Sequence, residues 1–563
     1  MITEIGIENF KAFAKTARIP LKPITLLFGP NSSGKSSLIQ AILMLRQTIE
    51  ESMSDEQTLL PKGKLVDLGN FSEFIHNHNE SLSFSLTFKI SPPIGLYDAI
   101  PTEDYISQTK GGSDRLNNLC DSIESLPLGI KITFSFENTK GIHVTQVDLL
   151  VGEDPTSIIT YVNEPPESME SLPDDADEKA KKLRESQWRI YRTSPKRYMK
   201  FKKIEDHEYW KKYFKHIKED EWWRQWKDEF DLLSEEYPEI DWNSTSTLTK
   251  EEKILARKMV KERQIRFLKC LMKTTRVLFA NDYLVLSKFM PVGLNGYDPQ
   301  YLTSCDFDLP DQDNISVLIL ASSYRVKEYL LNCIHLGPVR QNPERKFFFS
   351  GIISAYVGEH GQYTNEILVT NPDLVKKVNK QLSSLNLGYQ VKIVQLASDS
   401  SDVKISTIRL VNDSGIDLAV TDVGYGISQV LPIIAQSMLA EGKTIFIEQP
   451  ELHLHPAQQA ELGSFFAYCI RPENTKDANN TDGAEKPLPN RFIIETHSEN
   501  IILRLQKLIR KGELKKEDLA VIYFDKTAKG TEAKELRLND DGEFIDPWPH
   551  GFFEESFKEM FGD

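Results

Sequence analysis

Cysteine is scarce in this sequence, and long hydrophobic runs are missing. The chain has 563 residues but only 5 cysteines, which lie far apart, are odd in number and show no CxxC spacing. A disulfide framework and a cysteine-rich zinc site are therefore disfavoured. The longest apolar runs, Val430–Ile434 and Thr444–Ile447, are far shorter than the roughly 20 residues that a membrane helix requires. We therefore expect no membrane association.

A secretory signal and low-complexity tracts are also missing. The first residues, Met1 to Glu8, have neither the basic segment nor the apolar segment of a signal peptide. With 40% apolar and 27% charged residues, the composition is typical of a globular protein. A chain of this length exceeds one compact core, so we expect roughly two to four domains in a cytoplasmic protein.

Positive charge is in deficit overall but concentrated in one segment. The formal net charge is -15, yet residues 179–218 hold 15 Lys or Arg against 4 Asp or Glu, with aromatic residues between them. Cations beside aromatic faces suit single-stranded nucleic acid. Three interpretations stay open: a nucleic-acid or partner contact, a helical insert with a solvated lysine face, or docking on the acidic remainder of the chain.

The apolar periodicity divides the chain into three parts. Residues 1–155 show strands and one helix, residues 156–332 are long, charged and aromatic with helical periodicity, and residues 333–563 alternate strands and helices. This pattern predicts an α/β P-loop head, a mixed sheet with flanking antiparallel strands, interrupted by a helical insertion. The expected elements are a helix over Ser36–Glu51, parallel-type strands over Ile24–Phe28, Thr444–Glu448, Phe492–Glu495 and Leu519–Phe524, and antiparallel strands over Ser81–Lys89, Ile130–Glu137 and His143–Val151.

The strongest motif is a phosphate-binding loop that runs from Gly29 to Ser36 and fits the pattern GxxxxGK[ST]. Its glycines let the backbone curl so that N–H groups point at phosphate oxygens, Lys35 neutralises the β- and γ-phosphates, and the Ser36 hydroxyl ligates Mg²⁺. ATP and Mg²⁺ are the expected cofactors. The predicted nucleotide-binding residues of the loop are Gly29, Asn31, Ser32, Ser33, Gly34, Lys35, Ser36 and Ser37.

Polar residues follow two later apolar strands. Glu448 ends one strand and is the predicted Mg²⁺ ligand beside Ser36. Gln449 occupies the position of the usual water-activating carboxylate. Because an amide orients a water but cannot take its proton, we expect slow hydrolysis unless Glu451 substitutes. His497 follows the next strand, where an imidazole would meet a γ-phosphate. The predicted catalytic residues are Glu448, Gln449, Glu451 and His497.

A glycine-containing segment, Thr421–Gln429, precedes another predicted helix. Two glycines allow close backbone approach, and the N-terminal dipole of the helix would face an anion. The alternative is a glycine turn before a core helix. The histidine pairs 453/455 and 76/78 lack a nearby cysteine or third ligand, so no metal site is predicted at either pair.

Together these motifs resemble those of the ABC-type ATPases related to RecF, SMC heads and the OLD family. The resemblance covers about residues 1–155 and 333–563 and excludes the insert. It rests on Ile5–Phe13, the phosphate loop, Thr421–Gln429, Glu448–Pro456 and Glu495–Ser498.

In such heads, ATP is clamped between the phosphate loop of one protomer and a signature motif of another. The resemblance therefore implies a homodimer through ATP-sandwiched heads, or a higher oligomer. It implies that Lys35 and Ser36 form Walker A, that Glu448 is the Walker B acid, and that His497 is the switch histidine. The signature residues would be Gly424, Gly426, Ser428 and Gln429, and the D-loop would be Leu454–Pro456. Two departures stand out: Gln449 replaces the usual catalytic Glu, and the signature serine follows its glycines.

Within this class, three segments resemble the PtuA-type ATPases of Septu and Septu-like retron antiphage systems, whose partner is an HNH nuclease. These segments are Leu336–Arg340, Asn342–Arg345 and Asp540–Phe553. The resemblance implies a nucleotide-dependent sensor and scaffold that controls a partner nuclease, with a retron RNA–DNA hybrid as one ligand for residues 179–218. The alternatives are an ATPase of DNA repair or chromosome maintenance, and an OLD-like nuclease. Only 66 residues follow His497, which leaves little room for a nuclease domain.

Overall fold

The computed structural model describes residues 1–54, 57–91, 128–151, 157–163, 198–204, 283–294, 312–345, 347–348, 354–396, 405–471 and 489–548. The chain forms two compact units. Unit 1 comprises Met1–Ile2, Thr48–Leu60 and Glu80–Lys327, and unit 2 comprises Thr3–Gln47, Pro61–Asn79 and Glu328–Asp563. The phosphate loop and all other predicted catalytic and nucleotide-binding residues lie in unit 2.

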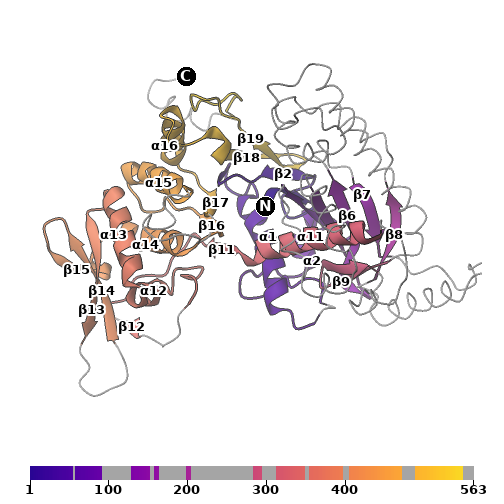
Figure 1. The fold of residues 1–563 in the computed structure, drawn as a ribbon, viewed down its shortest axis with the longest axis horizontal. Coiled ribbons are helices and arrows are strands. Elements are labelled where there is room, and N and C mark those ends of the chain that lie inside the picture. The colour runs from indigo at the N-terminus through magenta and orange to yellow at the C-terminus, as the bar shows by residue number, and fades with distance from the viewer. Residues whose placement is uncertain are drawn as a thin grey trace, which may run out of the picture. The chain divides into compact units, whose positions relative to one another are not determined.

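Unit 2 contains a six-stranded sheet with the order β11-β16-β17-β3-β18-β19 (Figure 1). Its strands are parallel from β11 to β18, and β19 is antiparallel. Every residue of β3 is buried, as expected of a parallel strand that is covered on both faces. The bounds are β3 (Ile24–Phe28), β11 (Cys333–Leu336), β16 (Thr444–Glu448), β17 (Arg491–Glu495), β18 (Leu519–Thr527) and β19 (Gly530–Glu535).

The helices of unit 2 begin at recognisable caps. The Ser498 side chain accepts a hydrogen bond from the Ile501 N–H at the start of α16, and Asn371 does the same for Leu374 in α13. Figure 1 shows α15 and α16 side by side. The bounds are α1 (Lys35–Glu51), α2 (Phe71–Phe74), η1 (His76–His78), α11 (Gln312–Leu331), α12 (Thr364–Thr370), α13 (Pro372–Ser384), η6 (Val420–Asp422), α14 (Tyr425–Leu439), α15 (Pro456–Cys469), α16 (Glu499–Arg510) and η8 (Lys516–Asp518), where α1 and α11 also extend into unit 1.

Two smaller antiparallel groups complete unit 2. One is the pair β1 and β2, which leads into β3. The other has the order β12-β14-β13, with β15 paired to β14, and α13 packs on β13. The apolar side chains of α12–α16 and of the six-stranded sheet form one buried cluster. The bounds are β1 (Ile2–Glu8), β2 (Ala17–Pro20), β12 (Phe347–Phe348), β13 (Tyr389–Leu396), β14 (Ile405–Asn412) and β15 (Asp417–Ala419).

Unit 1 is an antiparallel sheet in the order β10-β9-β8-β7-β6-β5-β4. Its core includes the stacked rings of Phe84 and Phe134, whose centroids lie 4.8 Å apart. The bounds are β4 (Phe84–Ile90), β5 (Leu128–Glu137), β6 (Gly141–Val151), β7 (Ser157–Val162), β8 (Tyr198–Ile204), β9 (Tyr283–Ser287) and β10 (Met290–Leu294).

The α/β class predicted from the sequence is confirmed, and each predicted strand and helix quoted above is present with small shifts at its ends. The described part of residues 156–332, where helical periodicity was expected, contains strands β7–β10 as well as α11. The alternating pattern of Tyr198–Ile204 is a strand pattern inside that segment. Strands β4–β6 belong to unit 1 together with β7–β10, and the phosphate loop belongs to unit 2. The reason is that the antiparallel pairing continues from β4 through β8.

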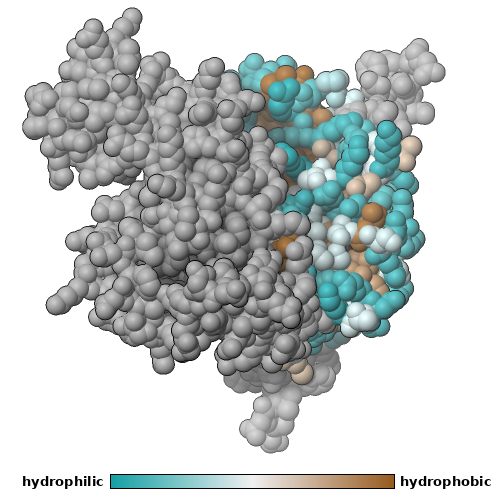
Figure 2. Space-filling view, turned by 90° about the vertical axis from the view of Figure 1, so that its right-hand side faces the viewer, coloured by the Kyte–Doolittle hydropathy of each residue, from teal (hydrophilic) through white to brown (hydrophobic). Residues whose placement is uncertain are grey.

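Most of the basic segment 179–218 and the end of the chain after Trp548 lie outside the described residues. Trp548 itself packs on Phe28 and Phe544, with ring centroids 6.3 and 4.9 Å away. Figure 2 shows one face of the molecule, on which the described residues are mostly hydrophilic with small, scattered hydrophobic spots. Among the described helices, none combines the length and the apolar character needed to cross a bilayer.

Candidate nucleotide-binding site

The phosphate loop connects β3 to α1 in a conformation that requires glycine. Gly29 has a φ of 139° and Gly34 a φ of 97°, in a region that other residues rarely adopt. A Cβ atom on Gly29 would lie 2.5 Å from the carbonyl oxygen of Phe524 in β18. Any side chain at this position would therefore push the loop away from the sheet.

The other loop residues have different environments. Asn31 and Ser32 are exposed, and Ser37 is partly buried. Ser33 is buried, and its hydroxyl oxygen has no hydrogen-bond partner among the described residues. A buried hydroxyl without a partner is costly, and it leaves one donor in the loop free for a further ligand.

Lys35 is held inside the loop, with 3% of its surface exposed. Its Nζ donates hydrogen bonds to the carbonyl oxygens of Gly29 and Pro30, both at 2.9 Å, and lies 4.0 Å from Glu495 Oε1. Burial lowers the pKa of Lys35, and the charges of Glu495 and Glu451 oppose this shift. The ammonium group is thus paired with oxygen atoms that a phosphate could replace.

Ser36 meets a carboxylate from the neighbouring strand. Its Oγ donates a hydrogen bond of 2.7 Å to Glu495 Oε2. Burial raises the pKa of Glu495, the Ser36 hydrogen bond lowers it, and the charge of Glu448 raises it further. Glu495 has no role in the sequence-based prediction, although it ends an apolar strand just as Glu448 does.

Glu448 faces a different partner. His335 Nε2 on β11 lies within hydrogen-bond distance of Glu448 Oε1, at 2.7 Å. His335 was not among the residues predicted from the sequence, although it is a polar residue inside the short apolar strand Cys333–Leu336. Glu448 and Ser36 were predicted to hold Mg²⁺ together, but their side chains make no direct contact here, since the Ser36 hydroxyl is hydrogen-bonded to Glu495.

Arg340 fixes the backbone at the end of β16. Its guanidinium donates to the carbonyl oxygens of Glu448 and Gln449, at 2.9 and 3.3 Å. Burial lowers its pKa to about 10, while the charges of Glu448 and Glu451 raise it. The sequence leaves a phosphate contact and an ion pair open for Arg340, and in the structure its guanidinium donates to backbone carbonyl oxygens. Arg345 pairs with Asp422.

Gln449 and Glu451 lie in the turn after β16. Gln449 has a φ of 46°, and its N–H donates 2.7 Å to the Glu495 carbonyl oxygen. Glu451 accepts hydrogen bonds of 2.7 Å from the Thr496 hydroxyl and the His497 N–H. Burial raises the pKa of Glu451, and these two hydrogen bonds oppose the shift. Glu451 thereby joins the turns that follow β16 and β17.

His497 lies beside the phosphate loop. Burial lowers its pKa, and the positive charge of Lys35 lowers it further. The imidazole is therefore neutral at neutral pH and can donate or accept one hydrogen bond at each nitrogen according to its tautomer. The structure thus brings together Lys35, Ser36, Glu448, Glu451 and His497 at the carboxyl ends of parallel strands.

These groups fit a nucleoside triphosphate with Mg²⁺. An ammonium group, a partnerless hydroxyl and the N-terminus of α1 suit phosphate oxygens. Hydroxyl and carboxylate oxygens are the ligands that Mg²⁺ takes. Among the described residues, no group of three or more His, Cys, Asp or Glu is arranged to hold a metal by itself, so phosphate oxygens would have to supply part of the ligand set.

The predicted signature lies at the start of α14. Gly424 is the N-cap, and a Cβ on Gly426 would come 2.8 Å from the His453 carbonyl oxygen. Ser428 and Gln429 are buried, and the Ser428 hydroxyl donates to the Tyr425 carbonyl oxygen at 2.7 Å. Tyr425, by contrast, is 58% exposed. The exposed part of this motif is therefore its glycine end.

His453, just before the predicted D-loop, contacts the segment Thr421–Gln429, and His455 within the D-loop caps a helix. Tyr425 and His453 have ring centroids 5.9 Å apart. His455 is the N-cap of α15, where its side chain accepts from the Ala457 N–H. Both histidine side chains thus have structural contacts within this part of the fold.

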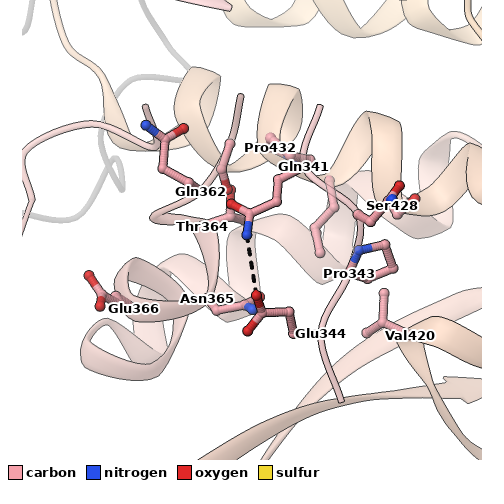
Figure 3. A pocket seen from close by; sticks show the side chains of 13 residues that line it. Gln341, Pro343, Glu344, Gln362, Thr364, Asn365, Glu366, Val420, Ser428 and Pro432 are labelled. Carbon is pink, nitrogen blue, oxygen red and sulfur yellow. Dashed lines mark hydrogen bonds between the residues drawn. The ribbon is translucent and has the colours of Figure 1, made fainter. Parts of the chain in front are cut away.

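A separate hollow of about 280 Å³ lies beside the first turn of α14. Figure 3 shows Gln341, Gln362 and Thr364 around it, with Ser428 at one side. Of the described residues that line it, two are glutamates and none is Lys, Arg or His. This lining does not favour a phosphate, so the hollow is distinct from the phosphate loop.

Comparisons with known proteins place the chain in a family. Near the end of the chain, residues 514–561 match a family described as a protein of unknown function (DUF3696). Among curated proteins, none matches the chain. Two solved structures align over nearly the full length. The Smc head domain from Pyrococcus furiosus, bound to the C-terminal domain of ScpA, has 10% identity and a TM-score of 0.32, covering 99% of this chain and 98% of that chain. The SMC head domain from Thermotoga maritima has 8% identity and a TM-score of 0.32, covering 95% and 99%.

These TM-scores lie below the level at which two chains share an overall fold, so the assignment rests on the sequence match. A family model described as AAA ATPase domain matches residues 1–276 and 353–502. The first matched stretch runs past residue 155, into the range expected to be an insertion without family resemblance. The match includes the phosphate loop and the ends of β16 and β17. The chain belongs to the AAA ATPase domain family.

Proposed function

We propose that the protein binds ATP with Mg²⁺ and hydrolyses it slowly, as a nucleotide-dependent switch. The observation that carries this proposal is the cluster of Lys35, Ser36 and Glu495 at the phosphate loop, with Ser36 Oγ 2.7 Å from Glu495 Oε2. Lys35 and the loop N–H groups would bind the phosphates, and Ser36 with a carboxylate would hold the metal. The bound Mg²⁺ would supply charge neutralisation of the β- and γ-phosphates.

The chain's own residues account for slow turnover. Gln449 can orient a water through its amide but cannot accept the water's proton. The Glu451 carboxylate accepts hydrogen bonds from the Thr496 hydroxyl and the His497 N–H, which fix its position in the turn and oppose the rise of its pKa. Neutral His497 can form a hydrogen bond without adding charge. A long-lived nucleotide state suits a switch better than a motor.

The test of nucleotide binding is Lys35→Ala, with Lys62→Ala as the matched control. Lys62 is 76% exposed at its side chain and lies outside the loop. We expect Lys35→Ala to lower the affinity for ATP at least about tenfold, because charge-assisted contacts to phosphate are lost, while Lys62→Ala binds normally. Binding would be measured by isothermal titration calorimetry with ATP and Mg²⁺. Equal affinity in the two variants would refute the proposal.

We further propose that two heads enclose the nucleotide, with the glycine end of α14 from one protomer at the phosphate loop of the other. Gly424 has no atom within 4 Å of a Cβ position and has a φ of -59°, so a side chain is tolerated there. Asp is also a favoured N-cap residue. Gly424→Asp therefore keeps the fold and places a negative charge where a phosphate would lie, and Gly424→Asn is its neutral control.

Light scattering with a non-hydrolysable ATP analogue tests this arrangement. We expect the wild-type mass to double and Gly424→Asp to stay monomeric, with Gly424→Asn less affected. Mixing Lys35→Ala with Gly424→Asp should then restore activity, since each mixed dimer has one intact site. With random exchange, about a quarter of the wild-type rate is expected. No recovery in a mixture that forms mixed dimers would exclude shared sites.

The biological role that we propose is ATPase subunit of an antiphage defence system with an HNH nuclease partner. It is supported by the resemblance of Leu336–Arg340 and Asp540–Phe553 to PtuA-type ATPases. Cells that carry the gene with its neighbours should resist phage, and Lys35→Ala should abolish this resistance. Co-purification with a neighbouring HNH protein would identify the partner. Resistance that is unchanged in Lys35→Ala would separate the defence role from nucleotide binding.

A further inference from the structure

A histidine on β11 lies beside the carboxylate that ends β16. The two strands pair in parallel, with His335 opposite Phe446. Because side chains alternate along a strand, Phe446 and Glu448 lie on the same face of the sheet, and His335 shares that face. His335 and Glu448 are therefore diagonal neighbours across the strand pair, within reach of long side chains. Only 7% of the His335 side chain and 12% of the Glu448 side chain are exposed.

The contact between these two side chains has a defined direction. His335 Nε2 lies 2.7 Å from Glu448 Oε1. An ionised carboxylate can only accept hydrogen bonds, so the Nε2 of His335 carries the hydrogen. The other ring nitrogen, Nδ1, lies 3.5 Å from Glu359 Oε1 and has no hydrogen-bond partner among the described residues. Within the described structure, the ring therefore makes its hydrogen bond to Glu448.

The two carboxylate oxygens of Glu448 consequently differ. Oε1 is held by His335, and the Glu448 backbone is held separately, since the Arg340 guanidinium donates to its carbonyl oxygen at 2.9 Å. Oε2 forms no hydrogen bond with any residue that the structure describes. Strands β16, β17 and β3 run parallel, so this carboxylate lies at the edge of the sheet where the phosphate loop begins.

We propose that His335 is a positioning residue for Glu448, which it holds by Oε1 so that Oε2 remains for the Mg²⁺ bound with ATP. This inference rests on the proposed ATP-binding function, with Glu448 as the metal-side acid predicted from the sequence. Metal-ligating carboxylates are commonly held by hydrogen bonds from neighbouring groups. Without the His335 N–H, the Glu448 carboxylate would have to be ordered when the metal binds, which weakens binding.

The test compares two substitutions of His335. His335→Phe keeps a ring on β11 but removes the donor, and His335→Gln keeps an N–H donor in a side chain of similar reach. Calorimetry would measure ATP affinity in EDTA and at increasing Mg²⁺ concentrations. Electron paramagnetic resonance would follow Mn²⁺ binding in the presence of a non-hydrolysable ATP analogue. Neither readout depends on turnover, and thermal melting would show that both variants are folded.

We expect His335→Phe to raise the Mg²⁺ concentration needed for tight ATP binding by about tenfold or more, with ATP binding in EDTA retained. His335→Gln should stay within about threefold of the wild type, because the donor is restored. An unchanged Mg²⁺ requirement in folded His335→Phe would overturn the proposal. An equal rise in His335→Gln would also overturn it.

Glu448→Ala separates positioning from packing. Alone it should raise the Mg²⁺ requirement by about tenfold or more. Adding His335→Phe should then change the requirement by less than about twofold, because His335 acts through the carboxylate that is already missing. Fully additive effects would show that His335 acts through packing and would overturn the proposal. Glu448→Ala with a normal Mg²⁺ requirement would overturn it as well.

A further measurement requires no substitution. In the wild-type protein at neutral pH, nitrogen-15 magnetic resonance should show the hydrogen of the His335 ring on Nε2. A hydrogen on Nδ1 alone would exclude donation to Glu448 and overturn the proposal. A wild-type protein that fails to bind ATP at any Mg²⁺ concentration would instead refute the proposed function.

Discussion

Gln449 combines an unusual backbone conformation with an unusual side chain. Its φ of 46° places it in the left-handed region, where a residue other than glycine is strained by of order 1 kcal/mol or more. Two hydrogen bonds hold this conformation. The Gln449 N–H donates to the Glu495 carbonyl oxygen, and the Arg340 guanidinium donates to the Gln449 carbonyl oxygen. The turn thus fixes the direction of the Cα–Cβ bond at position 449, so another side chain placed there would start in the same direction.

Gln449→Glu should therefore raise the rate of ATP hydrolysis. The new carboxylate can accept a proton from the attacking water, and general-base catalysis typically contributes about 100-fold or more. Phosphate release under saturating ATP measures the effect, with Gln449→Asn as a control that keeps an amide. An unchanged rate would show that geometry or Glu451, and not the missing base, limits turnover.

His497 offers a prediction on pH. Burial and Lys35 both lower its pKa below the ordinary value of 6.5. In nuclear magnetic resonance titrations, the His497 ring should titrate below 6.5, and Lys35→Met should move its pKa part of the way back, since burial remains. As the pH falls below 6.5, the unfolded chain takes up this proton first, so the contribution of His497 to the free energy of unfolding decreases. A His497 pKa at or above 6.5 would contradict the buried environment.

At the scale of elements, the hairpin of β18 and β19 contacts both ends of the phosphate loop. The Thr531 hydroxyl donates 2.7 Å to the Ser33 carbonyl oxygen, and the Thr531 N–H donates 2.8 Å to the Ala12 carbonyl oxygen. The close approach of Gly29 to Phe524 joins the other end of the loop to the same hairpin. The loop is thus held between a parallel strand and a hairpin that follows almost 500 residues later in the chain.

Thr531→Val keeps the side-chain shape and removes the hydroxyl. We expect a loss of about 1 kcal/mol in the free energy of unfolding, the usual value of one hydrogen bond, together with weaker ATP binding. Thr531→Ser retains the hydroxyl and should bind ATP as the wild type does. Chemical denaturation and calorimetry with ATP measure the two effects. If Thr531→Ser loses as much ATP affinity as Thr531→Val, packing of the methyl group and not the hydroxyl positions the loop.

At the scale of the whole molecule, charge separates one segment from the remainder. The formal charge is -15, although residues 179–218 carry 15 basic and 4 acidic residues. Within that segment the described backbone, Tyr198–Ile204, is strand β8 of unit 1. A basic segment attached to an acidic protein can bind a polyanion while the rest of the surface repels it.

Neutralising Lys202, Lys203, Lys211 and Lys212 together to Gln should weaken binding to single-stranded nucleic acid and flatten its dependence on salt. Each lost phosphate contact reduces the salt slope by about 0.7 for a single strand. Fluorescence anisotropy with a labelled oligonucleotide at several salt concentrations provides the measurement. Affinity and slope equal to those of the wild type would indicate that these lysines are solvated or bound to the protein itself.

Local motifs made much of this protein predictable. The loop Gly29–Ser36 is contiguous, and its motif is defined by residue types at fixed spacing, so roles for Lys35 and Ser36 could be predicted without a fold. The strands Ile24–Phe28 and Thr444–Glu448 are continuous apolar runs, because parallel strands are buried on both faces. The strands within 156–332 were harder to predict, since their alternation is short and is surrounded by charged sequence.

The sequence by itself determined that a phosphate loop, two strand-end carboxylates and a strand-end histidine exist in this chain. Only the tertiary structure decided which of them meet. Glu448 and Glu495 end similar strands, but hydrogen bonding places β17 next to β3 and β16 beyond it. Neighbours across a sheet are set by the order of strands, which depends on the packing of the whole unit. For that reason Ser36 meets Glu495, and Glu448 meets His335.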